Sequence, residues 1–283
     1  MVPMTLRHAA ALTVMLLMAA CHSDVPETPA AHATAASPPP LSLKASAKRW
    51  VPAPGTTWQW QLTVPVDLSV DAEIYDIDGF LNSAKVVADL HRRGRKAVCY
   101  VEVGAAENFR PDYNKWPKKL LGKSNGWSGE RWLDIRDPAK LKPVLAKRFD
   151  MCAAKGFDAI EPDLMDGYAS DTGFPITAAD QLRFNRFVAR LAHERGLSVA
   201  LKNDVEQVPE LVRYFDFTVN EQCAEYDECA GLKPFIAAGK AVLHAEYDLL
   251  PSAYCAQSRR LRLSSLHKNL NLDAAVTPCP RRA

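Results

Sequence analysis

The feature that most constrains the fold is a repeated order of helical pattern, glycine and short apolar run. Gly94, Gly156 and Gly196 each end a helix-like stretch and are followed at once by a run typical of a buried strand. A glycine that ends a helix and leads into a strand is characteristic of parallel α/β units. The chain therefore belongs to the α/β class.

Eight strand candidates follow one another between residues 58 and 270. They are residues 58–62, 73–77, 97–103, 157–160, 198–201, 215–219, 241–245 and 264–270, and helical patterns lie at 83–93, 141–155, 178–195 and 208–214. Eight strands in about 235 residues fit one closed (β/α)₈ barrel of the TIM type. The alternative is a doubly wound open sheet, but no glycine-rich phosphate loop follows the first strand.

The N-terminal residues do not belong to this barrel. Residues 1–21 have the form of a lipoprotein signal: Arg7 and His8 precede a short apolar stretch that ends Leu17-Met18-Ala19-Ala20-Cys21, similar to a lipobox. Lipid attached to Cys21 would anchor an exported bacterial protein to the cell envelope, its only contact with a membrane. Met18 is unusual there, so plain secretion is the alternative. Residues 22–47, rich in proline and alanine, are interpreted as a disordered tether, and residues 48–283 as the folded domain.

Charge and cysteine content narrow the partners. The net charge is +2 and no block of five basic residues occurs, which does not favour a nucleic acid partner. Six cysteines in an exported domain favour disulfides. We expect Cys223 to pair with Cys229 around a short acidic loop and Cys255 with Cys279, leaving Cys99 for Cys152, for which free thiols are the alternative. No C-x-x-C or spaced histidine cluster indicates a metal, no cofactor is expected, and a monomer is assumed.

Acidic residues gather where the predicted strands end. Glu161, Asp163 and Asp166 follow one strand and Glu221 follows another. Catalytic groups of a (β/α)₈ barrel lie at the C-terminal ends of its strands, and two facing carboxylates are the basic equipment for hydrolysing a glycosidic bond. We interpret Asp163 as the nucleophile and Glu221 as the general acid and base. A hard-cation site at Glu161, Asp163 and Asp166 is the alternative, although their spacing matches no metal loop.

Further residues are predicted to contact substrate. Many carboxylates on one rim would attract a cationic polymer of amino sugars. The long stretch 105–138 contains several aromatic residues that could stack on sugars or simply pack the loop. Predicted contacts are Asp76, Tyr100, Glu102, Trp132, Asp166, Tyr168, Lys202, Asn203, Glu246 and Tyr247.

Several motifs together resemble one family. They are Trp58-Gln59-Trp60-Gln61-Leu62, Cys99-Tyr100-Val101, Asn125-Gly126-Trp127, Arg131-Trp132-Leu133-Asp134-Ile135-Arg136, Gly156-Phe157-Asp158 through Asp166-Gly167-Tyr168, Lys202-Asn203-Asp204 and Asn220-Glu221-Gln222-Cys223. In this order they resemble glycoside hydrolase family 114, typified by endo-α-1,4-polygalactosaminidase, from about residue 50 to the C-terminus.

The resemblance implies a (β/α)₈ barrel that cleaves α-1,4-linked galactosamine polymers without a cofactor. It also implies a catalytic aspartate at Asp163 and a catalytic glutamate at Glu221. Glu102 departs from the family pattern, where a small polar residue is expected. Two alternatives stay open: a polysaccharide-binding lipoprotein without turnover, and a glycosidase for another amino-sugar linkage.

Overall fold

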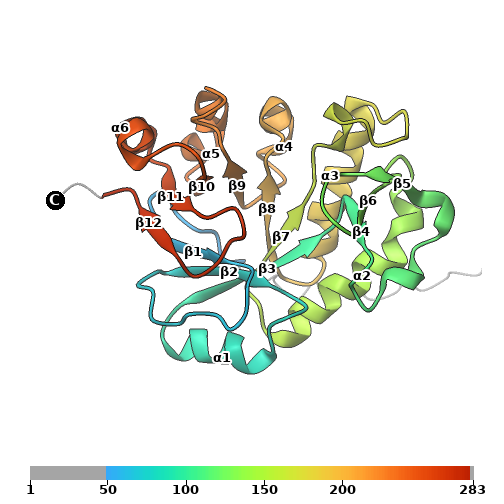
Figure 1. Cartoon of the computed structure of the whole chain (residues 1–283), viewed down its shortest axis with the longest axis horizontal. Coiled ribbons are helices and arrows are strands. Elements are labelled where there is room, and N and C mark those ends of the chain that lie inside the picture. Colours follow the sequence, from blue (N-terminus) through green and yellow to red (C-terminus); the bar gives the residue numbers. More distant parts are fainter. Residues whose placement is uncertain (1–48, 281–283) are drawn as a thin grey trace, which may run out of the picture. The chain divides into compact units, whose positions relative to one another are not determined.

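The computed structural model describes residues 49–280, whose strands form one curled sheet (Figure 1). The predicted signal, Cys21 and the whole of the predicted tether lie outside the described residues. The sheet runs in the order β1-β2-β3-β7-β8-β9-β10-β11-β12; the first eight strands are parallel neighbours and β12 is antiparallel to β11. The strands are β1 (Trp58–Gln61), β2 (Ile74–Asp78), β3 (Lys96–Glu102), β7 (Ala159–Asp163), β8 (Ser198–Lys202), β9 (Phe217–Glu221), β10 (Val242–Glu246), β11 (Ser264–Lys268) and β12 (Val276–Pro278).

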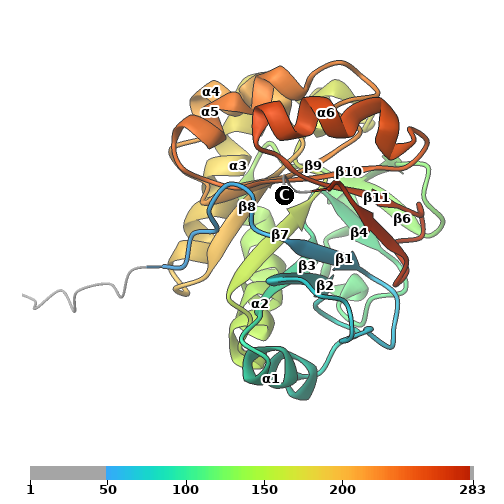
Figure 2. The same cartoon turned by 90° about the vertical axis from the view of Figure 1, so that its left-hand side faces the viewer.

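Helices lie around the outside of this sheet, as both views show (Figures 1 and 2). They are α1 (Ala84–Arg92), α2 (Pro138–Lys155), α3 (Ala178–His193), α4 (Val208–Leu211), α5 (Lys233–Ala237) and α6 (Pro251–Leu261). Local chemistry sets several ends: Thr177 and Asp180 form a reciprocal capping box at the start of α3, and Gly156 ends α2 in the left-handed conformation. Gly94 and Gly196 also have positive φ, as their place after a helix requires. The eight parallel strands and their surrounding helices confirm the predicted TIM-type barrel.

Two apolar cores explain why the strands are buried on both faces. One core fills the space between sheet and helices and includes Leu90, Phe149 and Phe184. The other fills the interior of the sheet and includes Trp60 and Phe217. Because successive side chains on a strand point to opposite faces, each strand contributes alternately to the two cores, and only inward-pointing residues can reach the mouth of the barrel.

The C-terminal segment covers the seam between β1 and β11, which do not pair in the described sheet. The backbone N–H of Leu62 donates to the carbonyl of Leu272 at 2.9 Å, and the Gln59 side chain donates to the carbonyl of Ala274 at 2.9 Å. Lys268 Nζ, nearly fully buried, donates to two carbonyls of the same segment. These bonds satisfy polar groups at an edge that would otherwise be left open.

The long stretch expected after the third strand is a small antiparallel sheet rather than an irregular loop. Its strands lie in the order β4-β6-β5. They are β4 (Ala105–Glu107), β5 (Leu121–Ser124) and β6 (Glu130–Leu133), and two short 3₁₀ turns, Tyr113–Lys115 and Lys118–Leu120, lie between β4 and β5. The other short 3₁₀ turns of the described residues lie outside this stretch, at Gly167–Ala169, Val205–Gln207 and Cys229–Leu232. We call residues 105–133 the inserted sheet.

The structure confirms all three expected disulfides: Cys99–Cys152, Cys223–Cys229 and Cys255–Cys279. The first joins the outer face of β3 to α2, so free thiols at this pair are ruled out. Within residues 49–280, no helix is both long and apolar enough to cross a bilayer.

Candidate active site

A cavity of about 270 Å³ opens at the C-terminal ends of the parallel strands. Its lining includes seven of the residues predicted from the sequence: Tyr100, Glu102, Asp163, Lys202, Asn203, Glu221 and Tyr247. Trp60 forms part of its floor, and Trp127 and Leu270, both exposed, belong to its walls. A larger cavity, about 650 Å³, lies near the opposite ends of β1 and β11 and is lined by none of the predicted catalytic residues or substrate contacts.

The Lys202 ammonium lies between the two carboxylates expected to be catalytic. Its Nζ is 2.7 Å from Asp163 Oδ1 and 2.9 Å from Glu221 Oε2, and the lysine side chain is only 3% exposed. Asp163 and Glu221 are the last residues of β7 and β9, on the inward face, whereas the sequence placed them just beyond the strands. Since both oxygens contact one nitrogen, Asp163 Oδ1 and Glu221 Oε2 can be at most about 5.6 Å apart, a close approach compatible with the ~5–5.5 Å carboxyl separation of retaining glycosidases.

Neighbouring polar groups fix the two carboxylates. Tyr100 Oη donates to Asp163 Oδ2 at 2.8 Å, and the backbone N–H of Leu164 donates to Asp163 Oδ1. Tyr247 Oη makes a short hydrogen bond to Glu221 Oε1. Asn203 accepts a hydrogen bond from the backbone N–H of Glu221, which orients the end of β9.

These contacts decide the charge of Asp163. Burial alone would raise the pKa of its carboxyl, but the Lys202 ammonium and the Tyr100 hydroxyl outweigh burial and hold that pKa below its usual value. Asp163 is therefore ionised at neutral pH. A buried, ionised carboxylate with limited exposure is suited to act as a nucleophile.

A second carboxyl pair, Asp76 and Glu161, lies deeper in the barrel interior. Both side chains are fully buried, and the two carboxyls face each other and can share a hydrogen bond when one is protonated, while no other described donor bonds to their oxygens. Lys202 Nζ is 3.7 Å from Glu161. Burial raises the pKa of Asp76 to about 7, and burial together with the charge of Asp76 raises the pKa of Glu161 well above its usual range. The pair therefore holds protons near neutral pH, so the Lys202 ammonium forms its close ion pairs with Asp163 and Glu221.

The other predicted substrate contacts do not line the cavity. Glu246 points to the outer face of β10, where it accepts hydrogen bonds from His244 and from the backbone N–H of Ala224. Trp132 is buried against Gly167.

Two more predicted contacts also lie outside the lining. The Tyr168 hydroxyl donates to Glu206 at 3.0 Å. Asp166 is half-buried beside the site, and burial raises its pKa to about 6.

The lining residues that escaped the sequence analysis include one carboxylate and one exposed aromatic residue. Glu130 was not predicted, and Trp127 was noted only as one aromatic of the long stretch. Both come from the inserted sheet, whose fold the apolar pattern did not indicate. The only signal was the turn chemistry of Asn125-Gly126 and Gly129, which marks a hairpin in a stretch already expected to be functional.

Metal ligation has little support in this geometry. Within residues 49–280, the one converging group of three possible ligands is Cys223, Cys229 and His244, and its two sulfur atoms are already joined to each other. Glu161, Asp163 and Asp166 do not form such a group. Instead, Asp163 is occupied by Lys202 and Tyr100, and Glu161 faces the barrel interior.

A parallel barrel with two close carboxylates at its C-terminal mouth is the architecture of a glycosidase. Comparison with known proteins agrees with this class. The model of glycoside-hydrolase family GH114 matches residues 40–283, so the chain belongs to this family and is a glycosidase.

Individual relatives extend the comparison. The crystal structure of Aspergillus fumigatus Ega3 in complex with galactosamine is 39% identical, with a TM-score of 0.78, and the match covers 83% of this chain and 100% of that one. The glycoside hydrolase domain of PelA from Pseudomonas aeruginosa shares the fold, with a TM-score of 0.61 at 14% identity over 80% of this chain and 98% of that one. An uncharacterized protein of Deinococcus radiodurans is 26% identical over 90% of this chain and 93% of its own length.

Proposed function

We propose that this protein hydrolyses α-1,4-linked galactosamine-containing polysaccharide by a double-displacement mechanism with net retention. The observation that carries the mechanism is the single Lys202 ammonium that contacts both Asp163 and Glu221, because it brings one oxygen of each carboxylate within about 5.6 Å of the other, an approach that favours retention. The galactosamine bound by Ega3, at 39% identity, supports the choice of sugar.

Asp163 acts as the nucleophile in this mechanism. Its ionised carboxylate attacks the anomeric carbon and forms a glycosyl ester as the bond to the leaving oxygen breaks. Lys202 and Tyr100 hold the attacking carboxylate in place and keep it charged. Glu221, whose side chain is 24% exposed against 16% for Asp163, is the more open of the two and can take up a proton from solvent.

Glu221 acts first as acid and then as base. It donates a proton to the leaving oxygen in the first step. In the second step it removes a proton from the water that hydrolyses the glycosyl ester, which frees Asp163 and restores the protonated Glu221. The Tyr247 hydroxyl and the Asn203 Nδ2 group donate to the carboxyl of Glu221 and keep it turned toward the cavity during both steps.

The test is mass-spectrometric product analysis with partly deacetylated α-1,4-galactosaminogalactan. We expect the wild type to release oligosaccharides and both Asp163→Asn and Glu221→Gln to release none. Asp171→Asn and Glu210→Gln are matched controls, because both residues are exposed and neither lines the cavity. No release by a folded wild-type protein would refute the substrate, and release by either cavity variant would refute the role of that residue.

Export and anchoring belong to the same proposal. A cell-envelope polysaccharide is outside the cytoplasm, so its hydrolase needs the signal that residues 1–21 resemble, and lipid on Cys21 would retain the enzyme at the envelope. Labelling cells with a radioactive or alkyne fatty acid should mark the protein, and Cys21→Ser should abolish the label.

A further inference from the structure

Two carboxylates of the cavity have no part in the double displacement. Glu102 ends β3, and Glu130 begins β6 of the inserted sheet. Both line the cavity beside Asp163. Because the two residues belong to different strands, only the tertiary structure brings them close together.

Glu102 is held rigidly and presents one free oxygen. The side chain is 2% exposed, and its Oε1 accepts the backbone N–H groups of Gly104 and Ala105 at 3.0 and 3.1 Å. Among the described residues, none donates a hydrogen bond to Oε2. Burial, and then the negative charges of Asp163, Glu107 and Glu130, raise the pKa of Glu102 well above its usual range. The charge of Arg148 opposes this rise but does not overcome it, and within residues 49–280 no cation forms an ion pair with the Glu102 carboxyl.

Glu130 is fixed next to an aromatic ring. Asn125 Nδ2 donates to Glu130 Oε2 at 2.8 Å, while Asn125 Oδ1 accepts the backbone N–H of Trp127 at 3.1 Å. One asparagine therefore couples the carboxylate to the Trp127 segment and leaves Glu130 Oε1 without a described donor. The Trp127 side chain is largely exposed while it lines the cavity, so a ligand can lie against its ring.

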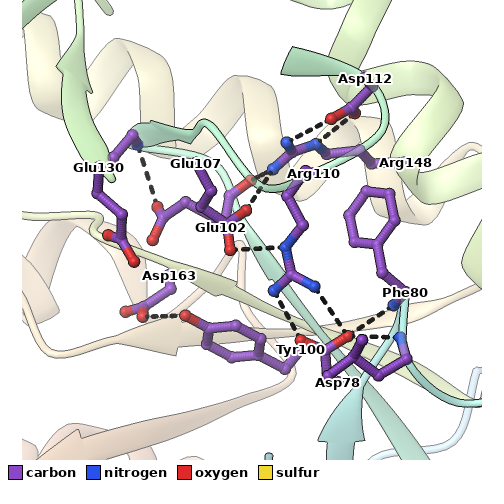
Figure 3. Close-up of polar contacts among 12 residues, drawn as sticks. Asp78, Phe80, Tyr100, Glu102, Glu107, Arg110, Asp112, Glu130, Arg148 and Asp163 are labelled. Carbon is purple, nitrogen blue, oxygen red and sulfur yellow. Dashed lines mark hydrogen bonds and ion pairs between the residues drawn. The ribbon is translucent and has the colours of Figure 1, made fainter. Parts of the chain in front are cut away.

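The nearby cations are already engaged elsewhere. Arg110 makes a two-pronged ion pair with Asp78 and a further one with Glu107. Arg148 makes the same kind of contact with Asp112, and Figure 3 shows both guanidinium groups turned toward these partners while the Glu130 carboxylate lies on the side of Asp163. Within residues 49–280, no lysine or arginine side chain forms an ion pair with Glu102 or Glu130. A ligand cation would supply the missing charge.

We propose that Glu102, Glu130 and Trp127 form a subsite for one hexosamine unit, in which the two carboxylates bind its ammonium and the indole stacks on its ring. This inference rests on the proposed function and specifies which form of the sugar the cleft selects. A bound ammonium lowers the pKa of the acids beside it, so the proton that Glu102 holds in the free protein leaves to solvent when the ligand binds. The three N–H donors of the ammonium can then bond to Glu102 Oε2 and Glu130 Oε1, which accept no other hydrogen bond from the described residues. An N-acetyl group is neutral and offers one N–H, so it leaves a carboxylate unpaired in a buried site.

The test compares kcat/KM for an α-1,4-galactosamine oligomer with that for its N-acetylated counterpart. Glutamine at either position preserves the shape and keeps an oxygen for the existing donors, from Gly104 and Ala105 or from Asn125. We expect Glu102→Gln and Glu130→Gln each to lower the preference for the free amine about tenfold, the effect typical of losing a hydrogen bond between charged groups. Glu210→Gln, which removes an exposed carboxylate from α4, should leave the preference unchanged.

Trp127→Ala should weaken turnover of both oligomers alike, because stacking does not distinguish the two nitrogen substituents. An unchanged preference in both glutamine variants would overturn the subsite while leaving the glycosidase intact. If the wild type cleaves neither oligomer, calorimetric binding of the same two oligomers decides. Amine-selective binding that weakens about tenfold in Glu130→Gln would uphold the subsite and refute only the reaction. Binding without amine selectivity, or no binding, would overturn the subsite as well.

Discussion

Replacing Lys202 by methionine should move the acidic limb of the pH–rate profile to higher pH. At an effective dielectric constant of ~20, an ammonium 2.7 Å from a carboxylate oxygen contributes about 6 kcal/mol of attraction. The burial of Asp163 opposes ionisation, and without Lys202 this opposition prevails, so the pKa of Asp163 rises. A neighbouring cation commonly lowers a carboxyl pKa by about 1 to 3 units, and we expect a displacement of the same size.

The direction of this shift follows from the role of Asp163. A nucleophile must be ionised, so the enzyme is active only above the pKa of Asp163, and raising that pKa removes activity first at low pH. The same substitution leaves Asp163 and Glu221 without their shared cation, at a cost of about 3–5 kcal/mol in the free energy of unfolding near neutral pH. Protonation of both acids should reduce this cost as the pH falls.

The assay is kcat/KM against pH for the wild type and Lys202→Met, with denaturant unfolding measured in parallel. Lys240→Met is a matched control, because Lys240 Nζ is also partly buried but donates to the carbonyls of Val212 and Phe215, away from the cavity. Lys240→Met should lower the free energy of unfolding without moving the acidic limb of the pH–rate profile. An acidic limb at the same pH in Lys202→Met and the wild type would refute the electrostatic reasoning, whatever the loss of rate.

Three further predictions concern the surroundings of the site. Asp76 is protonated in the folded state up to about pH 7 but ionises near pH 4 in the unfolded chain. Its contribution of about 4 kcal/mol to the free energy of unfolding is therefore present at low pH and is lost as the pH rises from 4 to 7. Asp76→Asn should flatten this fall in denaturant titrations at pH 4.5 and 7.5. Tyr247→Phe removes the hydroxyl that donates to Glu221 and should lower kcat about tenfold or more with little change in KM; an unchanged kcat would contradict a positioning role. Arg110→Met breaks a buried ion-pair network and should destabilise the protein by about 3–5 kcal/mol, whereas Arg136→Met at an exposed pair should cost about 0–1 kcal/mol; equal costs in thermal or chemical unfolding would contradict this difference.

Side-chain alternation explains one difference between expectation and structure. Glu246 lies at a strand end like Asp163 and Glu221, and strand position alone made it a candidate contact. In β10, however, Leu243 and Ala245 point into the barrel, so Glu246 points outward and Tyr247 reaches the cavity. A shift of one residue in a strand exchanges its two faces, and residue types alone did not define which face of β10 is inward.

The inserted sheet accounts for the rest of the difference. Glu130 and Trp127 reach the cavity because β6 pairs with both β4 and β5, and the resulting inserted sheet contributes to the cavity wall. The buried ion pairs of Arg110 with Asp78 and of Arg148 with Asp112 and Glu107 hold this arrangement, and they join residues 32 to 41 positions apart. Such contacts leave no periodic pattern in the sequence.

Local patterns in the sequence determined the class of fold, the order of the strands and the strand ends that carry Asp163, Lys202 and Glu221, and they indicated the pairs Cys223–Cys229 and Cys255–Cys279. These features depend on periodicity, turn residues and strand order, all of which are written along the chain. Only the tertiary structure decided that one ammonium lies between the two carboxylates and that Asp76 and Glu161 are buried beneath it. It also brought Glu102 and Glu130 to the same wall of the cavity. Distance, burial and charge compensation arise only when separate elements pack together, because each depends on residues that are remote in sequence.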